Sequence, residues 1–417
     1  YFGTDGIRCK ADLLTTEFIA KIAKGLTRYA ESRGIDTPRV FLAGDTRESS
    51  EWILQDFCRA FETLGVEYSC AGVLPTPAIN YAFYEMGFDF AVDVTASHNP
   101  HYDNGVKVSE RGEKFGVKLG AEGREIVERE LTEGQNYELV AATLREDLHE
   151  DALDRYMNHL REYVGKVDFS GLRIGVDCAN GAQGVIGGKI FEELGAEVVV
   201  INDNVNYGTA INDGCGSTHL EALAELVKRE GLDLGVAFDG DGDRCMMVDG
   251  NGEEVDGDQI LVVLTEFLQL NGLAVTVMAN QGLIEWAQER GVKLEVTPVG
   301  DQHVSAAMRK YNIQLGGEQC GHVVLPGEPF GDGMLVGLMV TKAVAVSKRS
   351  LAELAGAMTK FPQIIRNMNA DDEQKKLLEG EKAAAIIKEF EEKLAPVKGR
   401  LLVRPSGTEP VVRITMW

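Results

Sequence analysis

The chain has 417 residues, of which 66 are acidic and 42 basic, and its formal net charge is −24. We expect no nucleic-acid partner and no membrane surface, because both would require basic patches. A chain of this length is expected to form two to four domains, since one hydrophobic core rarely serves so many residues. The hydrophobic content of 44% and the 47 glycines are typical of a globular α/β protein with many tight turns.

The cysteines and the apolar runs point to a cytoplasmic protein. The seven cysteines are scattered and none forms a C-x-x-C pair, which favours reduced thiols over disulfides or a zinc site. No run approaches the ~18 apolar residues of a membrane span. No signal peptide is visible, and we therefore expect a cytoplasmic location.

Strand-like runs alternate with helical patterns along most of the chain, which predicts an α/β protein with largely parallel sheets. One plan, a β-rich run followed by a small-residue turn and a helix, occurs three times. A second plan, an apolar strand that runs straight into a polar loop, follows each of these segments. The first plan begins at Val40, Ile174 and Val275, and the second at Phe88, Leu232 and Ile313. We expect three related α/β domains with mixed or parallel sheets. The alternative is that generic βα units resemble one another.

The last part of the chain differs from these repeats. A highly charged helical pattern runs from Asp371 to Leu394, and two short apolar runs flank the loop RPSGTEP. These features predict a smaller C-terminal α+β domain. The predicted domains are residues 1–147, 148–249, 250–358 and 359–417. Ligands bind at the carboxyl ends of parallel strands, so the polar loops TASHNP, DGDGDR and GEQCGH are expected to meet in a central cleft.

The loop DGDGDR places Asp239, Asp241 and Asp243 at alternate positions after an apolar strand. Carboxylates with this spacing can converge on one hard cation, and we favour Mg²⁺. An EF-hand is excluded, because its sixth position would be Arg244 and its twelfth Gly250. A solvated acidic turn is the remaining alternative.

The loop TASHNP contains Ser97 beside His98. A Ser–His hydrolase pair would require an acid and an oxyanion hole, and adjacent side chains on an extended chain point to opposite sides. A helix cap or a local turn is a simpler interpretation. In a third interpretation Ser97 carries a phosphoryl group, whose oxygens would complete the three-aspartate metal site.

Other charged residues suit a sugar phosphate, which would be the small anionic partner of the chain. Arg404 and Arg413 flank the loop RPSGTEP and could hold a phosphate that is not cleaved, although a plain turn explains PSG. Glu318 could bind sugar hydroxyls. Arg8 and Lys107 each add a cation.

Together, FGTDGIR, TASHNP, DGDGDR, GEQCGH and RPSGTEP resemble the α-D-phosphohexomutase family along essentially the whole chain. The segments YDNGVK, GCGSTH and GEQ are most similar to the phosphoglucosamine mutase subfamily. That subfamily interconverts glucosamine 6-phosphate and glucosamine 1-phosphate. The resemblance implies three related α/β domains and a smaller fourth domain around a central cleft.

The resemblance also implies a role for each motif. Ser97 would be the phosphoserine, and with Asp239, Asp241 and Asp243 it would bind one Mg²⁺ per chain. The residues around the reactive phosphate would be Arg8, Lys107 and Arg244; those of the sugar loop, Glu318, Cys320 and His322; and those of the phosphate loop, Arg404, Ser406, Gly407, Thr408 and Arg413. From its place beside Ser97, we also expect His98 to position the phosphoserine. The intermediate would be a 1,6-bisphosphate, with glucosamine 1,6-bisphosphate or a similar compound as activator, and the enzyme a monomer or homodimer.

Two positions depart from the family pattern. Cys320 stands where the sugar loop usually has serine, and Cys9 where the first motif usually has glycine. A thiol is a poorer hydrogen-bond donor than a hydroxyl, so the preferred hexose is in question. The alternatives are a phosphomannomutase/phosphoglucomutase with the same mechanism and a catalytically weak sugar-phosphate-binding homologue.

Overall fold

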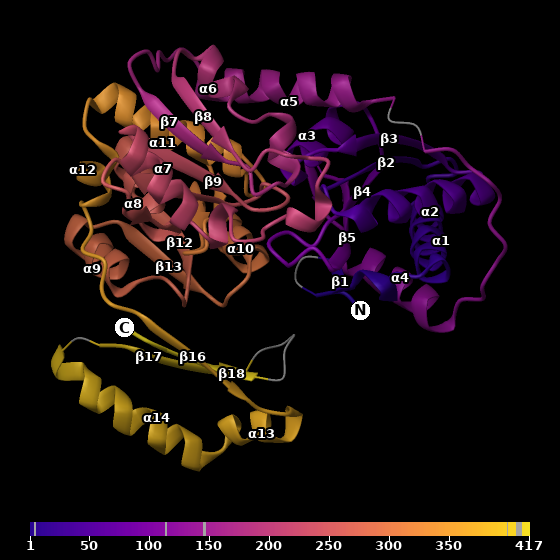
Figure 1. Cartoon of the computed structure of the whole chain (residues 1–417). Coiled ribbons are helices and arrows are strands. Elements are labelled where there is room, and N and C mark those ends of the chain that lie inside the picture. The colour runs from indigo at the N-terminus through magenta and orange to yellow at the C-terminus, as the bar shows by residue number, and fades with distance from the viewer. Residues whose placement is uncertain (4–5, 113–114, 145–146, 398, 406–410) are drawn as a thin grey trace.

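The structure is a computed structural model that describes residues 1–3, 6–112, 115–144, 147–397, 399–405 and 411–417 (Figure 1). Three of the predicted phosphate-loop residues, Ser406, Gly407 and Thr408, lie outside the described residues. Four sheets follow one another along the chain, each accompanied by its own helices.

The first sheet has the strand order β1-β5-β4-β2-β3, and β6 pairs with β5. Strands β2, β3 and β4 are parallel, and β5 runs antiparallel to β4. Its strands are β1 (Ile7–Lys10), β2 (Arg39–Gly44), β3 (Glu67–Val73), β4 (Phe90–Val94), β5 (Asp103–Arg111) and β6 (Gly116–Lys118). Its helices are α1 (Thr16–Ser32), α2 (Glu48–Leu64), α3 (Thr76–Glu85) and α4 (Ala121–Glu133).

The second sheet has the order β11-β10-β9-β7-β8 and the third the order β13-β12-β14-β15. The strands of the second are β7 (Arg173–Asp177), β8 (Glu197–Ile201), β9 (Leu234–Phe238), β10 (Cys245–Asp249) and β11 (Glu254–Val255), with helices α5 (His149–Val164), α6 (Lys189–Glu193) and α7 (Glu221–Glu230). The third contains β12 (Gly272–Thr276), β13 (Lys293–Thr297), β14 (Leu315–Gly317) and β15 (Val323–Val324), with α8 (Gly257–Phe267), α9 (Gln281–Arg290), α10 (Asp301–Tyr311), α11 (Gly333–Ser347) and α12 (Leu351–Ala355).

The three sheets share one arrangement, which confirms the predicted repeat. In each, a central strand lies between two parallel neighbours, and the later neighbour is followed by an antiparallel strand. The central strands β2, β7 and β12 contain the starting points of the first repeated plan. The loops TASHNP, DGDGDR and GEQCGH connect β4 to β5, β9 to β10 and β14 to β15. Each motif therefore lies at the carboxyl end of a parallel strand.

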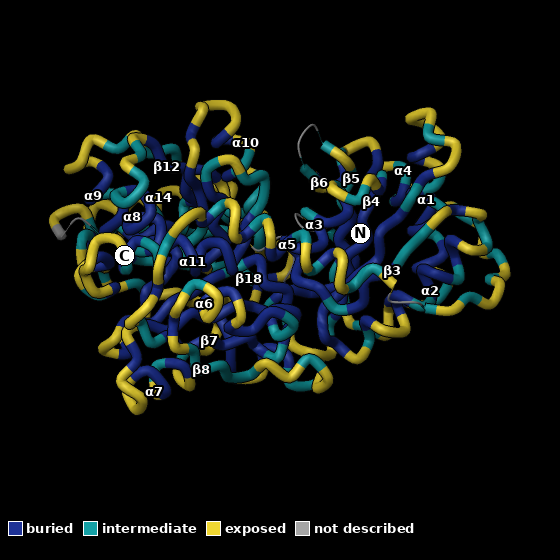
Figure 2. The backbone as a smooth tube through the Cα atoms, turned by 90° about the horizontal axis from the view of Figure 1, so that it is seen from above, coloured by how far each residue is buried: buried dark blue, intermediate teal, exposed yellow. Residues whose placement is uncertain are grey.

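One hydrophobic core runs through all three of these units. It includes Phe83 of α3, Leu160 of α5, Phe238 of β9 and Leu338 of α11. Helix α11 is apolar on nearly all sides, which is the pattern of a helix enclosed by other elements. Figure 2 shows buried residues in dark blue through the interior of this body. The three units are thus packed together, which fixes the relative positions of their loops.

The fourth sheet is smaller and antiparallel, with the order β16-β18-β17. Its strands are β16 (Ile364–Asn369), β17 (Leu401–Pro405) and β18 (Val411–Met416), and its helices are α13 (Asp372–Lys376) and α14 (Glu381–Leu394). In Figure 1 this domain lies below the rest of the molecule, with α14 on its outer side. The predicted fold class, three α/β domains and a smaller α+β domain, is confirmed.

A side-chain clamp attaches the fourth domain to the third. The amide nitrogen of Asn280 donates to the carbonyl of Phe361 at 2.9 Å, and its amide oxygen accepts from the backbone N–H of Phe361 at 3.0 Å. Arg400, which precedes β17, donates to the carbonyl of Ala279. Both contacts are made at the carboxyl end of β12, so the fourth domain is anchored at the edge where the other loops lie.

The pairing of strand β11 bears on the boundary between the second and third domains. Strand β11 (Glu254–Val255) pairs with β10 of the second sheet, although it lies within the range 250–358 predicted for the third domain. Among the helices of the described residues, none is both long enough and apolar enough to cross a membrane.

His159 of α5 lies where three domains meet. Its ring stacks on Tyr81 of α3 with centroids 4.3 Å apart, and its Nε2 lies 3.3 Å from Oε1 of Glu328, which precedes α11. Burial alone would lower the pKa of His159, but the pairing with Glu328 outweighs it and the pKa is raised. The pair therefore stabilises the packed body most when His159 is protonated.

We expect Glu328→Gln to destabilise the protein in a pH-dependent way. A raised histidine pKa contributes stability that is complete below its unfolded value of about 6.5 and is lost as the pH rises through the folded value. The substitution should lower the unfolding temperature by about 2–4 °C near pH 6 and by less near pH 9. Thermal unfolding followed by circular dichroism measures both values. Glu192→Gln, at an exposed position on α6, is the control, and an equal effect at both pH values would contradict the assignment.

Candidate active site

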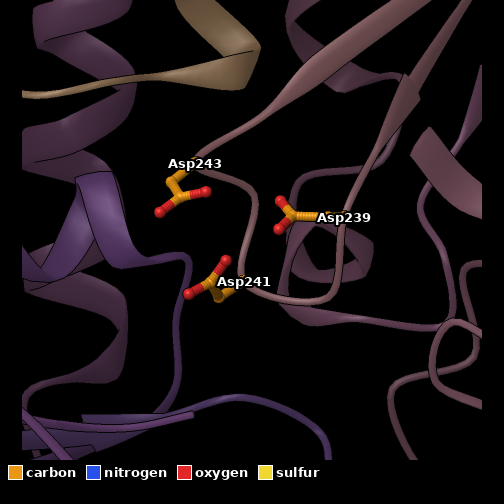
Figure 3. A group of neighbouring side chains, drawn as sticks. All are labelled: Asp239, Asp241 and Asp243. Atoms are coloured by element: carbon orange, nitrogen blue, oxygen red, sulfur yellow. The ribbon is translucent and has the colours of Figure 1, made fainter. Parts of the chain in front are cut away.

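Three aspartates form a cluster in the loop between β9 and β10. Asp239, Asp241 and Asp243 are 0%, 1% and 6% exposed, and each offers an oxygen within 4.8 Å of the others. Figure 3 shows the three carboxylates facing a common space. Gly242 has a φ of 73°, a conformation that favours glycine and that turns the loop so that alternate side chains converge.

Two basic side chains offset part of this negative charge. Nζ of Lys107, on β5, lies 2.7 Å from Oδ2 of Asp241 and 3.2 Å from Oδ2 of Asp243. Nε of Arg244 lies 3.9 Å from an oxygen of Asp239 and 3.9 Å from one of Asp243. Both were predicted to surround the reactive phosphate, and both contact the aspartate cluster.

The pKa values within the cluster diverge. Burial would raise the pKa of Asp243, but Lys107 and His322, whose Nδ1 lies 3.7 Å away, hold it well below its usual range. Burial opposes protonation of His322, yet the pairing with Asp243 raises its pKa to about 9. Burial and the neighbouring carboxylates of Asp241 and Asp243 raise the pKa of Asp239 to about 8. The three carboxylates therefore repel one another strongly enough to raise the pKa of Asp239, and their converging oxygens are ligands that suit a hard divalent cation.

Ser97 connects the first domain to this cluster. It is buried in the turn after β4, and its Oγ donates to Oδ2 of Asp239 at 2.6 Å. The Oγ also lies 3.3 Å from Nδ1 of His98, so the expectation that the two side chains point to opposite sides is wrong. The reason is the φ of 53° at Ser97, which replaces the extended backbone by a turn. Burial and the nearby cations Arg244 and Arg8 lower the pKa of His98 to about 3, so its ring is neutral.

Several residues outside the sequence motifs support these loops. Oγ1 of Thr76 lies 3.0 Å from Oδ2 of Asp241 and 2.6 Å from Oδ2 of Asp93. Arg47, after β2, and Asn212, in the second domain, donate to backbone carbonyls of the serine loop. The position of Arg47 in the sequence could have identified it, because it follows the central strand of a sheet whose carboxyl edge was expected to bind ligands.

The predicted sugar loop lies between β14 and β15. Glu318 and Cys320 line a cleft of about 740 Å³, together with Gln363 of the segment that leads to the fourth domain. Cys320 is exposed. The Glu318 carboxylate accepts from the N–H of Gly300 at 3.2 Å. His322 contacts the aspartate cluster instead, so the loop joins the cleft to that cluster.

The arginines of the predicted phosphate loop lie on the fourth domain. Arg404 of β17 and Arg413 of β18 are directly opposite each other in the sheet. Like charges in this arrangement repel, and an anion between them would relieve the repulsion. Burial and Arg413 lower the pKa of Arg404, whereas Glu318 acts in the opposite sense.

Comparison with known proteins agrees with this arrangement of loops. Residues 1–138, 154–252, 256–361 and 343–416 match, in order, domains I, II and III and the C-terminal domain described as phosphoglucomutase/phosphomannomutase. The chain belongs to the phosphoglucomutase/phosphomannomutase family. Membership of this family identifies it as an enzyme that acts as an isomerase and phosphotransferase, and it confirms the predicted resemblance to the phosphohexomutases.

Two phosphoglucosamine mutases are among the similar members of this family. That of Clostridium botulinum (strain Eklund 17B) is 40% identical and the alignment covers 100% of this chain and 94% of that protein. That of Caldicellulosiruptor saccharolyticus is 38% identical over 99% of this chain and 93% of that protein. The structure of a putative phosphomannomutase from Thermus thermophilus has the same fold, with a TM-score of 0.75 and 21% identity over 100% of this chain and 94% of that one.

We expect Asp241→Asn to weaken divalent-metal binding by more than about 10-fold, because it removes one of three converging carboxylates. Titration with Mn²⁺, followed by its electron paramagnetic resonance signal, measures the affinity without turnover. Asp249→Asn is the matched control, since Asp249 is also buried and accepts backbone N–H groups of Asn251 and Glu253 in its own turn. Equal metal affinity in the two variants would rule out the aspartate cluster as the metal site.

Proposed function

We propose that the chain interconverts glucosamine 6-phosphate and glucosamine 1-phosphate through a phosphoserine at Ser97 and a 1,6-bisphosphate intermediate. The observation that carries this proposal is the 2.6 Å contact between the Ser97 hydroxyl and Asp239, at the edge of a buried carboxylate cluster. Family membership and the phosphoglucosamine mutases that are about 40% identical support the reaction and the substrate.

We further propose that the cluster holds one Mg²⁺ per chain. Its ligands would be Asp239, Asp241, Asp243 and an oxygen of phosphorylated Ser97, which is within reach of the same space. The hard oxygen donors and the raised pKa of Asp239 support a divalent cation there. When bound, the ion would act as a Lewis acid on the phosphoryl group.

The two hydroxyls of the sugar explain why the protein would carry a phosphoryl group. O1 and O6 lie at opposite ends of a hexose, so one phosphate cannot pass directly between them. In the first transfer a bond forms from the free sugar oxygen to phosphorus while the bond from phosphorus to Ser97 Oγ breaks. The resulting bisphosphate turns over in the cleft and returns its other phosphoryl group to Ser97. Glucosamine 1,6-bisphosphate or a similar compound would restore the phosphoserine if it is lost.

The basic residues around Ser97 would serve this transfer. Arg8, Lys107 and Arg244 would offset the charge of the phosphoryl group in flight. Lys107, which is paired with two carboxylates, would mediate the proton exchange in which the attacking sugar hydroxyl loses a proton and the leaving Ser97 Oγ gains one. The neutral ring of His98, 3.3 Å from Oγ, would orient the phosphoserine.

The remaining predicted residues would hold the substrate. Glu318, Cys320 and His322 would bind the sugar, and the phosphate that does not react would lie on the fourth domain. Its proposed ligands are Arg404, Ser406, Gly407, Thr408 and Arg413. We retain residues 1–147, 148–249, 250–358 and 359–417 as proposed domains, with β11 of the third range paired to the second sheet, and we propose a cytoplasmic monomer or homodimer.

A second candidate is a phosphomannomutase/phosphoglucomutase with the same mechanism. Cys320 puts the preferred hexose and the rate in question, because an exposed thiol stands in the sugar loop where the family pattern has serine. Parallel assays with glucosamine 6-phosphate, mannose 1-phosphate and glucose 1-phosphate distinguish the two activities. A catalytically weak sugar-phosphate-binding homologue would turn over none of the three.

We expect Ser97→Ala to lower kcat by at least about 10³-fold, because it removes the group that carries the phosphoryl. Intact mass spectrometry of the wild-type protein before and after phosphatase should show the loss of one phosphoryl group, which the variant lacks. Ser32→Ala, which removes a hydroxyl that donates to a carbonyl within α1, is the control. An active Ser97→Ala variant would refute the phosphoserine mechanism.

We expect Cys320→Ser to lower the KM for the preferred sugar phosphate by about 2- to 10-fold with little change in kcat, since a hydroxyl is a stronger donor than a thiol. Steady-state kinetics with each of the three sugar phosphates measures this change. A KM that is the same in the variant and the wild type for every substrate would show that residue 320 does not contact the sugar.

A further inference from the structure

Arg47 is a fully buried arginine whose side chain is directed at the serine loop. It follows β2, and its guanidinium is 0% exposed. Five hydrogen bonds leave this group, which matches the five N–H donors of an arginine. The acceptors are the carboxylate of Asp45 and the backbone carbonyls of Ser97, Asn99, Pro100 and Asp103. The guanidinium therefore binds both ends of the turn that carries Ser97.

The buried charge of Arg47 is balanced within the same domain. Nε donates to Oδ2 of Asp45 at 2.9 Å, and Oγ1 of Thr95 donates to the same oxygen at 2.7 Å. A buried ion pair of this kind is tolerated because each partner is also hydrogen-bonded. Because lysine has a single amino group, it cannot reproduce the planar set of contacts.

A residue of the second domain binds the same carbonyls. Nδ2 of Asn212 donates to the carbonyl of Ser97 at 2.9 Å and to that of Asn99 at 3.1 Å. These are the two acceptors that Nη2 of Arg47 binds, at 2.9 and 2.8 Å. Gly240 of the aspartate loop also approaches closely, since a Cβ there would lie 2.6 Å from the Ser97 carbonyl. The carbonyl is thus enclosed by groups from two domains.

The backbone of Ser97 requires such support. Its φ of 53° is a left-handed conformation that is strained in any residue other than glycine. Local sequence does not offset this strain, because serine has no intrinsic preference for that region. The same conformation directs Oγ to Asp239 at 2.6 Å. The position of the Ser97 hydroxyl at the aspartate cluster therefore depends on Arg47 and Asn212, which bind the Ser97 carbonyl.

We propose that Arg47 and Asn212 are positioning residues that hold the Ser97 turn in its left-handed conformation and keep the phosphoryl-carrying oxygen at the aspartate cluster. This inference rests on the proposed function, because it assigns the two residues to the phosphoserine. They act through the serine backbone and bind no sugar. Their loss should therefore reduce kcat and the fraction of phosphorylated Ser97 while the KM for the sugar phosphate changes little.

The test compares Asn212→Ala and Arg47→Lys with the wild-type enzyme. A displacement of a reacting group by about 1 Å lowers rates by roughly 100-fold, so we expect kcat to fall about 10- to 100-fold in each variant. Leu264→Ala, which opens a cavity in the buried face of α8, is the control for lost stability. Measured quantities are kcat, KM, the unfolding temperature and the occupancy of phosphoserine by intact mass after incubation with glucose 1,6-bisphosphate.

The outcomes separate this inference from the proposed function. The positioning role is supported if kcat falls in Asn212→Ala while its KM is unchanged and Leu264→Ala remains active. A folded Asn212→Ala variant with unchanged kcat overturns it, as does a loss of activity that Leu264→Ala shares at an equal loss of stability. If Arg47→Lys does not fold, Asn212→Ala decides alone. If instead the wild-type protein carries no phosphoserine and Ser97→Ala is active, the proposed function fails first, and this inference with it.

Discussion

Mutual repulsion among three buried carboxylates determines how the rest of the cleft is built. The oxygens of Asp239, Asp241 and Asp243 lie within 4.8 Å of one another, a separation at which like charges in a medium of low dielectric are costly. Lys107 comes to them from the first domain and His322 from the third. Because each domain supplies a compensating group, the packing of the three domains and the chemistry of the site depend on the same contacts.

Much of this arrangement could be predicted from sequence, because the decisive residues are adjacent in the chain. The repeat located the central strands, and the rule that ligands bind at the carboxyl ends of parallel strands then placed the motif loops together. The supports of these loops could not be found in this way. Asn212 lies 115 residues from the carbonyl of Ser97 that it binds, and a backbone carbonyl leaves no pattern in the sequence. The contacts of Arg47 could not be identified from the sequence for the same reason, because Arg47 also binds backbone carbonyls of the serine loop.

The relation between Ser97 and His98 shows where local rules fail. Alternation of side chains holds for an extended chain, but the φ of 53° at Ser97 breaks it. That angle is imposed by Arg47, Asn212 and the close approach of Gly240, all of them distant in sequence. A serine and a histidine that a strand would have separated are thereby brought within 3.3 Å. Tertiary contacts, and not the hexapeptide, decide which groups surround the hydroxyl.

The clamp between Asn280 and Phe361 has a consequence for how this enzyme can change over evolutionary time. Asn280 binds the N–H and the carbonyl of residue 361, groups that every amino acid except proline would present alike. The attachment of the fourth domain is therefore indifferent to the side chain at that position. Substitutions in the connecting segment can therefore change the lining of the neighbouring cleft, to which Phe361 and Gln363 contribute, while the attachment of the fourth domain is kept.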